Sequence, residues 1–202
     1  TIVPLITETK PIRFEGNNYD PAWEKEAEKR GLPNKKTTPE SLKDIVTKKN
    51  KDIFVKLNIL SEVEVESIYI ILVEQYIKVV NIEVETALMM AKTLVIPSVI
   101  KYQSVLSESV NRLSSIEGVD AKVLKKQLEM VSTYSRIVSE LYEKIEKLEK
   151  VLEQKEKIEH EDKKAEFYCN EIIPLMYGMR ETVDLLEEHT GDEYWVLPKY
   201  RE

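Results

Sequence analysis

The side chains that most often carry chemistry in proteins are few in this sequence. Its 202 residues include one cysteine, Cys169, and two histidines, His160 and His189. A two-metal site inside a helical bundle uses Glu-x-x-His pairs, in which a glutamate lies three residues before each histidine. Lys157 and Leu186 occupy those positions. We therefore expect no metal site, and we interpret both histidines as solvated residues near helix ends.

Nucleophilic and phosphate-binding motifs are not found either. A reactive cysteine needs a basic neighbour to form its thiolate, and the sequence around Cys169 indicates none, so we interpret this residue as a small buried hydrophobe. The five glycines are scattered and match neither GxGxxG nor GxxxxGK. A single cysteine excludes a disulfide framework and favours a reducing, cytosolic location. We assign no catalytic, cofactor-binding or metal-binding residue.

The charge balance argues against nucleic acid as a partner. The chain has 30 lysines and arginines against 37 aspartates and glutamates, which leaves a net charge of −7. Broad contact with a phosphate backbone needs a face rich in lysine and arginine. The only basic patch consists of Lys35, Lys36, Lys48, Lys49 and Lys51. We interpret this patch as a solvated loop in preference to an anion or nucleic-acid contact.

Two groups of large side chains belong either to a core or to a contact surface. Core packing explains the methionines that lie beside the apolar positions of the expected helices. These are Met89, Met90, Met176 and Met179. Large aromatic residues at a chain end usually dock on something. Tyr194, Trp195 and Tyr200 are therefore expected to pack on the chain's own helices or on a neighbouring domain or subunit.

Composition indicates a helical domain with a substantial core. Hydrophobic residues make up 42% of the chain and charged residues 33%, a balance typical of helices and not of an all-β sandwich or barrel. The hydrophobic fraction is also too large for a disordered chain. The most membrane-like stretch, residues 68–84, is uninterrupted only over residues 68–73. A spanning helix needs roughly 20 apolar residues, so no membrane contact is expected.

The first 60 residues are expected to form an arm followed by short helices. Residues 1–19 alternate loosely in hydrophobicity, which predicts an extended arm with one short strand at residues 11–15. Within residues 20–60, helices are expected to begin at Asp20-Pro21 and at Thr38-Pro39. A polar N-cap residue followed by proline suits the first turn of a helix.

Residues 61–190 are expected to form an antiparallel bundle of about three long helices. A capping box at Ser61 and Glu64 opens the first helix. Its apolar residues keep helical spacing without a turn residue until Gly118, far beyond the length of a strand. Helices of this length cannot be buried singly, so they must pack on one another.

The other two long helices are predicted from the same kind of spacing. One covers about residues 120–158 with apolar positions close to a heptad repeat, and the other covers about residues 161–188. Pro97 and Pro174 are expected to kink the first and third helices. The predicted fold class is therefore all-α, with residues 191–202 as an aromatic C-terminal tail.

Distinctive short motifs are spread along the chain in a fixed order. Residues 13–32 contain RFEGNNY, Trp23 and EAEKRGL, and residues 195–200 read WVLPKY. Shorter motifs lie between them at residues 37–40, 81–83, 90–93, 96–97 and 102–103. Together these motifs resemble the C-terminal region of type III glutamine synthetases, from the junction after the catalytic domain to the extreme C-terminus. The resemblance covers nearly the whole chain, although the long middle helix is generic and adds nothing to it.

The resemblance implies a parent enzyme that condenses ammonia with glutamate, uses ATP and a divalent metal (Mg or Mn), and works as a large oligomer of stacked rings. The ligands for ATP, metal and glutamate belong to that family's catalytic domain, and the matching motifs are absent here. Residues 1–19 would be the last part of that domain, so we expect this chain, which begins at Thr1, to be a piece of a longer protein. We expect the piece to be inactive alone: a cytoplasmic, structural helical extension that packs on the catalytic body or on neighbouring subunits.

A second hypothesis comes from a different class of protein. On this hypothesis the chain is an independent helical interaction module, unrelated to any synthetase, that binds a partner helix through its apolar stripes. Such a module has no reason to keep the motifs at residues 13–19 and 195–200 in that order, whereas the synthetase extension has both.

Overall fold

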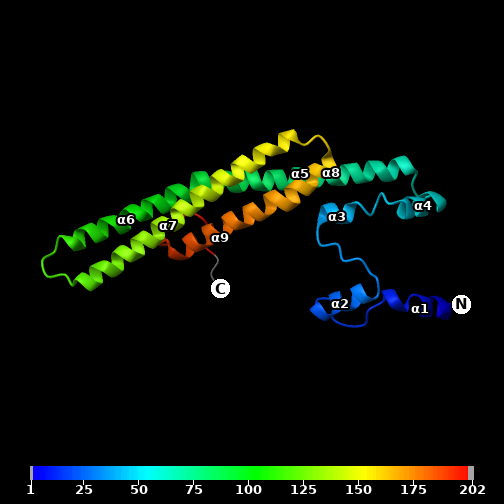
Figure 1. Ribbon diagram of the computed structural model, residues 1–202, viewed down its shortest axis with the longest axis horizontal. Coiled ribbons are helices and arrows are strands. Elements are labelled where there is room, and N and C mark those ends of the chain that lie inside the picture. The colour runs from blue at the N-terminus through cyan, green and yellow to red at the C-terminus, as the bar shows by residue number, and fades with distance from the viewer. Residues whose placement is uncertain (1, 200–202) are drawn as a thin grey trace.

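The computed structural model describes residues 2–199, which form helices and turns and contain no β-strand. The predicted all-α fold class is confirmed. Four short helices precede the long ones (Figure 1). They are α1 (Ile2–Glu8), α2 (Pro21–Lys29), α3 (Thr38–Leu42) and α4 (Lys48–Lys56). In the described part of the chain, no helix is both long enough and apolar enough to span a membrane.

The beginning of the arm differs from the expected strand. In place of a strand at residues 11–15, the chain forms α1 and then a single 3-10 turn at Lys10–Ile12. A strand is stable only when it pairs with others in a sheet, and residues 2–199 offer no strand to pair with. Helix α1 instead satisfies polar groups locally, since the Thr7 and Thr9 hydroxyls donate to backbone carbonyls four residues back at 3.1 and 2.7 Å.

The first long stretch continues through a proline. It consists of α5 (Glu62–Met90), a π-helical segment η2 (Ala91–Val95) and α6 (Ile96–Ser114). The expected capping box begins it: the Ser61 N–H donates to Glu64 Oε2 at 2.7 Å, and the Glu64 N–H donates to Ser61 Oγ at 3.3 Å. Pro97 has no backbone N–H to donate to the carbonyl four residues back, and the wider turn of η2 accommodates the missing hydrogen bond.

The remaining long stretches follow a tight turn at Gly118. The second is α7 (Ala121–Leu152), which ends in a 3-10 segment, η3 (Glu153–Lys157). The third consists of α8 (Glu161–Phe167), a second π-helical segment η4 (Tyr168–Ile172) and α9 (Ile173–His189). Both π segments end two residues before a proline, Pro97 or Pro174. Neither proline ends its helix, and the bend expected at each stays a prediction.

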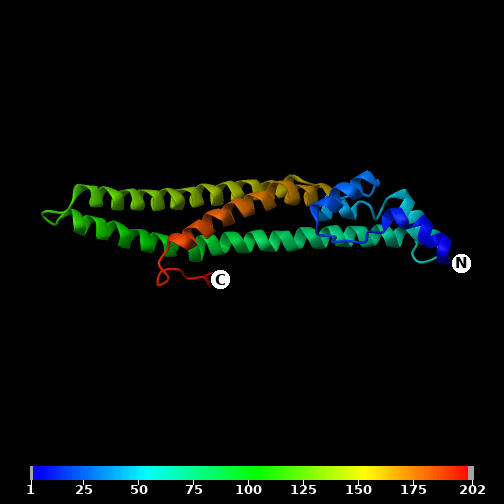
Figure 2. The same ribbon diagram turned by 90° about the horizontal axis from the view of Figure 1, so that it is seen from below.

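The three long stretches lie side by side and alternate in direction (Figures 1 and 2). Helix α7 returns along α6, and α9 then packs against α7 while running in the direction of α5. Because α9 ends part-way along the bundle, the α6–α7 hairpin projects beyond it, at the left of Figure 1. Helices α1 to α4 lie at the opposite end, near the start of α5.

The core follows the apolar spacing predicted for α7. Its buried residues recur every three or four positions, as Tyr134, Val138, Leu141, Ile145, Leu148 and Leu152. This row belongs to one core with buried residues of α5, η4 and α9, including Val84, Ile172 and Leu186. Leu141 and Leu148 have no exposed surface. Burial of this single row therefore joins all three long stretches.

Shortening a side chain of this row is expected to destabilise the bundle. Leu148→Ala leaves a cavity in a fully buried position, which lowers the free energy of unfolding by about 2–5 kcal/mol. The matched control on the same helix is Leu128→Ala, where the residue is 51% exposed and the loss stays below about 1 kcal/mol. Urea denaturation followed by circular dichroism measures both values. Equal losses in the two variants would contradict the central role of the row.

Candidate functional site

The N-terminal arm folds around the motif at residues 13–32. The Phe14 and Trp23 rings stack with their centroids 4.0 Å apart, and the Arg30 guanidinium lies 5.4 Å from the centre of the Trp23 ring. Arg30 Nη1 also donates to the Arg13 carbonyl at 3.0 Å. A Cβ at Gly16 would lie 2.7 Å from the Phe14 ring, so a larger residue there would displace the ring. The motif thus builds a small unit of its own.

This unit leaves much apolar surface open. Helix α1 buries none of its residues. Ile2 and Val3 are each 72% exposed, Leu5 is 61% exposed and Ile12 is 63% exposed. Clusters of exposed large apolar residues on a folded chain usually mark a contact surface. The arm is therefore one candidate docking site.

Three of the five lysines of the basic patch form ion pairs within the chain, and Lys48, Lys49 and Lys51 lie in α4 and not in a loop as expected. Lys35 lies 3.4 Å from Glu40 and Lys36 lies 3.7 Å from Glu24. Lys51 forms ion pairs with two glutamates of α5, Glu62 at 3.4 Å and Glu66. The hydrogen bond to Glu66 is the main cause that raises the pKa of Lys51. These lysines thus connect the short helices to each other and to α5.

The aromatic tail docks on the bundle of its own chain. Trp195 is only 7% exposed, and the Tyr194 ring packs against Tyr102 with centroids 5.3 Å apart. Ser98 donates a hydrogen bond to the Tyr194 carbonyl. The first of the two expected docking surfaces, the chain's own helices, is therefore the one observed for these two residues. Tyr200 lies outside the described residues.

Polar contacts anchor the start of the tail. The Tyr134 hydroxyl lies 2.8 Å from Thr190 Oγ1 in a buried position, and the Thr190 hydroxyl also donates to the Leu186 carbonyl at 2.6 Å. Burial raises the pKa of Tyr134. Lys199 Nζ reaches back to the Thr190 carbonyl at 2.6 Å. Helix α7, the end of α9 and the tail are thus fastened at one residue, Thr190.

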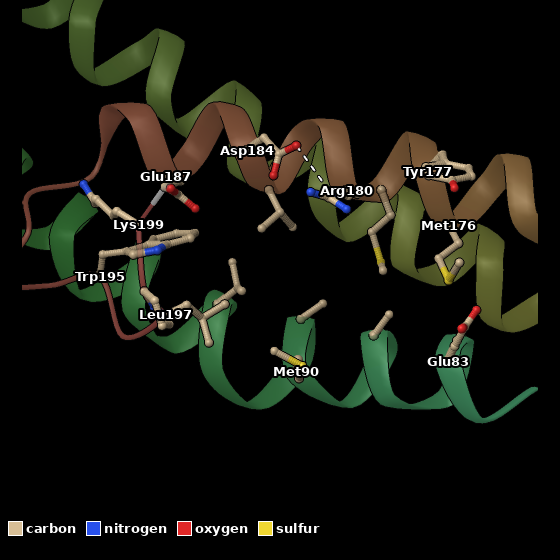
Figure 3. Close-up of a pocket in the computed structure, with 16 residues that line it drawn as sticks. Glu83, Met90, Met176, Tyr177, Arg180, Asp184, Glu187, Trp195, Leu197 and Lys199 are labelled. Carbon is tan, nitrogen blue, oxygen red and sulfur yellow. Dashed lines mark ion pairs between the residues drawn. The ribbon is translucent and has the colours of Figure 1, made fainter. Parts of the chain in front are cut away.

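A cleft of about 740 Å³ lies between α5, α9 and the tail (Figure 3). Trp195 points into it from the tail, and Met90 of α5 and Met176 of α9 line it. The indole Nε1 of Trp195 is buried and has no hydrogen-bond partner among the described atoms. The described residues that line the cleft include no histidine, cysteine or serine. Charged residues of α5, α9 and the tail also line it, namely Glu83, Arg180, Asp184, Glu187 and Lys199. The cleft therefore combines apolar contact with a charged edge, where Arg180 pairs with Asp184 at 3.6 Å.

The methionines are only partly in the core. Met179 is buried, as expected. Met90 and Met176 are half-buried and line the cleft, and Met89 is exposed on the opposite side of α5. Core packing was therefore the wrong expectation for Met89, because its position on the helix is one that neither α7 nor α9 covers.

A polar cluster that sequence reasoning missed centres on Asn81. Its side-chain oxygen accepts hydrogen bonds from the Tyr168 hydroxyl at 2.6 Å and from Lys155 Nζ at 2.8 Å. Lys155 also pairs with Glu85 at 3.1 Å and lowers the pKa of that carboxyl. Burial, followed by the charges of nearby glutamates, raises the pKa of Tyr168 to about 12. The signal in the sequence was an asparagine placed between two apolar residues, Val80 and Ile82.

The residues first considered for chemistry lie apart from one another. His160 precedes α8 and is exposed, and His189 is exposed with Nδ1 2.8 Å from the Leu185 carbonyl. Cys169 is half-buried in η4 and not fully buried as expected. Burial and a hydrogen bond with this thiol raise the pKa of Tyr76. Within residues 2–199, no three His, Cys, Asp or Glu side chains converge as metal ligands would.

Comparison with known protein families gives a match to the first part of this chain. A family model described as the glutamine synthetase C-terminal domain matches residues 1–114, more than half of the chain. The chain belongs to the glutamine synthetase C-terminal domain family. The resemblance deduced from the motifs of this domain is thereby confirmed.

Full-length relatives of this synthetase C-terminal domain are much longer than the chain. It is 34% identical to the type-3 glutamine synthetase of Dictyostelium discoideum, over 95% of this chain and 26% of the relative. It is 31% identical to a glutamine synthetase of Bacteroides fragilis, over 98% of this chain and 27% of the relative. A glutamine synthetase of Butyrivibrio fibrisolvens is 29% identical, over 96% and 27% respectively. The chain thus spans about a quarter of the length of these relatives.

Alkaline pH is expected to destabilise this synthetase C-terminal domain through Tyr168. An unfolded tyrosine ionises near pH 10, whereas the pKa of Tyr168 in the folded domain is about 12. Between these values the unfolded chain releases a proton that the folded domain keeps, so the free energy of unfolding falls as the pH rises. The contribution of Tyr168 is fully present below about pH 10 and is lost towards pH 12.

The matched variant is Tyr168→Phe, which cannot ionise. Its unfolding free energy starts lower at about pH 8, because the hydrogen bond to Asn81 is lost, but it falls less steeply above about pH 10. Urea denaturation at several pH values measures both slopes. Identical slopes in the two proteins would contradict a raised pKa at this position.

Proposed function

We propose that the chain is a non-catalytic, structural domain at the C-terminal end of a type-3 glutamine synthetase. The observation that carries the proposal is the family match over residues 1–114. The similarity to a type-3 glutamine synthetase over 95% of the chain supports it. On this proposal the parent enzyme forms glutamine from glutamate, ammonia and ATP with a divalent metal, as the resemblance implies.

The residues of this chain do not suit the ATP and metal sites of such an enzyme. A divalent metal with ATP phosphates needs converging carboxylates and donors shaped to hold phosphate. The described residues bring no three potential ligands together, and the five glycines form no phosphate loop. We therefore place nucleotide, metal and glutamate binding in the other three quarters of the parent protein.

The proposed role of this domain is to pack on the rest of a homo-oligomeric enzyme in the cytoplasm. Residues 1–19 would join it to the catalytic domain, residues 20–60 would link the two, residues 61–190 would form the bundle, and residues 191–202 would be its tail. The open apolar surface of α1 supports contact between the arm and the catalytic body or a neighbouring subunit. The alternative, an independent interaction module, is not favoured because the family match includes the arm.

An assay of glutamine formation tests whether this domain is non-catalytic. The 202-residue chain, mixed with glutamate, ammonia, ATP and Mg²⁺, is expected to form no glutamine above background, because residues 2–199 bring no three potential metal ligands together. The full-length synthetase is the positive control. Robust glutamine formation by the 202-residue chain would overturn the proposal.

A charge placed on the arm tests the docking role. Leu5→Asp is expected to leave the unfolding of the 202-residue chain unchanged, because Leu5 is 61% exposed there. In the full-length synthetase the docked arm would bury this carboxylate without a partner. The unfolding temperature is therefore expected to fall by about 2–4 °C or more. The matched control is Ile116→Asp at the hairpin tip, where the residue is 57% exposed. An equal effect of the two changes in the full-length enzyme would count against docking through the arm.

A further inference from the structure

One side of α5 carries large apolar side chains that remain exposed in the described chain. Ile71, Ile82 and Met89 are exposed over 61%, 63% and 51% of their surface. They are eleven and seven residues apart, which places them on one face of a helix with 3.6 residues per turn. Ile68 and Val79 are also exposed and lie beside them. We call these five residues the outer row of α5.

The outer row is additional to the row that α5 buries in the bundle. The buried row consists of Val65, Val73, Ile77, Val80, Val84 and Leu88. A helix that is apolar nearly all round is normally buried on more than one side. The second half of α7 shows the contrast, because its exposed side carries charges such as Glu143 and Lys147, whereas exposed apolar residues such as Leu128 lie nearer the hairpin. The apolar outer row is therefore a property of α5 and not of every long helix here.

Charge limits what can cover the outer row. Helix α5 contains six glutamates and one lysine. Lys51 and Lys155 reach it from neighbouring segments and pair with some of these glutamates, and the helix still stays negative. Two copies of α5 packed face to face would bring like charges together, which opposes association. The charge of α5 therefore favours a partner that has an apolar centre and a basic edge.

The two sides of the row carry the charges that such an edge would meet. Glu74 and Glu83 are nine residues apart, or about two and a half turns, so they lie on opposite flanks of the helix. Two exposed polar residues, Gln75 and Lys78, lie between Ile71 and Ile82 on the same face, and Lys78 pairs with Glu74 at 3.1 Å. The outer row is thus a set of exposed apolar residues with polar residues among them and acid on both flanks.

The path of the chain indicates which molecule supplies the partner surface. Lys51 ties α4 to the first turn of α5, and helices α1 to α3 lie at the same end of the bundle (Figures 1 and 2). In a longer synthetase, the polypeptide before Ile2 would therefore emerge at the end of the bundle where α5 and its outer row begin. Since this chain spans about a quarter of its relatives, a large protein body remains to be placed there.

We propose that the outer row of α5 is the surface on which the catalytic portion of a type-3 glutamine synthetase docks, through an apolar patch edged with lysine or arginine. This inference rests on the proposed function and goes further, because it assigns the contact to one face of one helix. The catalytic portion then contacts this domain at two places, the arm and the outer row.

Site-specific crosslinking in the full-length synthetase tests the contact. The photoreactive residue benzoylphenylalanine is placed at one position in each of three variants. It replaces Ile82 in the outer row, Leu5 on the arm, or, as a control, Leu128 on the exposed side of the α6–α7 hairpin. The probe reacts only with atoms in contact with it, so we expect the Ile82 position to crosslink to residues outside this chain at least about ten times more than the Leu128 position. Crosslinks from Ile82 to α5 of a second copy, or a yield equal to that at Leu128, would overturn the inference.

The Leu5 position separates failure of this inference from failure of the proposed function. Crosslinks from Leu5 to the catalytic portion, with none from Ile82, would support the proposed function and contradict only the docking through the outer row. An absence of crosslinks from both positions would contradict both the proposed function and this inference.

Charge substitution gives an independent readout. The double variant Ile71→Lys, Ile82→Lys is expected to keep the helix content of the 202-residue chain, because both side chains are exposed. In the full-length enzyme it weakens docking at least about tenfold, since lysine would enter an apolar contact. Trypsin cleavage at Lys35 and Lys36, between the arm and α3, is then at least about ten times faster, whereas Leu128→Lys leaves the rate unchanged. An unchanged rate in the double variant would contradict the inference.

Discussion

The buried apolar row of α7 runs from Tyr134 to Leu152 and must be covered over that length, and α7 achieves this by lying against two other stretches. Helix α6 covers the part near the hairpin, and α9 covers the remainder. Two polar contacts then select one alignment, since Gln103 bonds Ser135 at 2.7 Å and Lys144 bonds Thr182 at 2.7 Å. Apolar burial thus sets which helices meet, and hydrogen bonds set which residues face each other.

The features that could be predicted are those decided within a few residues. The capping box at Ser61 and Glu64 and the heptad-like row of α7 depend only on spacing; the capping box is found as expected, and the row is buried from Tyr134 onwards but not at Leu128. The strand at residues 11–15 was wrong because an apolar alternation says nothing of whether a partner strand exists. The docking of Trp195 needed Ser98 and Thr190, which are far apart in sequence, so spacing could not select it. The cleft likewise arises from three separate segments.

The two sides of α5 explain how one domain can be both a stable bundle and a part of something larger. Its buried row completes the core with α7 and α9, while its outer row and the arm stay open. A bundle built for itself would place charges on that second face, as the second half of α7 does. In a glutamine synthetase C-terminal domain, the exposed outer row and arm suit contact with another part of the same polypeptide.

The π segments have a consequence for how sequences of this family can change in length. A π turn holds one residue more than an α-helical turn, so it absorbs a one-residue insertion while the helix on either side keeps its facing. The same insertion in a regular α-helix would rotate everything after it by about 100°. Loss of one residue from Ala91–Val95 would therefore restore a regular helix and leave Val99 in the core. Elsewhere in the long helices a single insertion or deletion turns buried residues outward, so η2 and η4 are the places where the length of these helices can change by one residue.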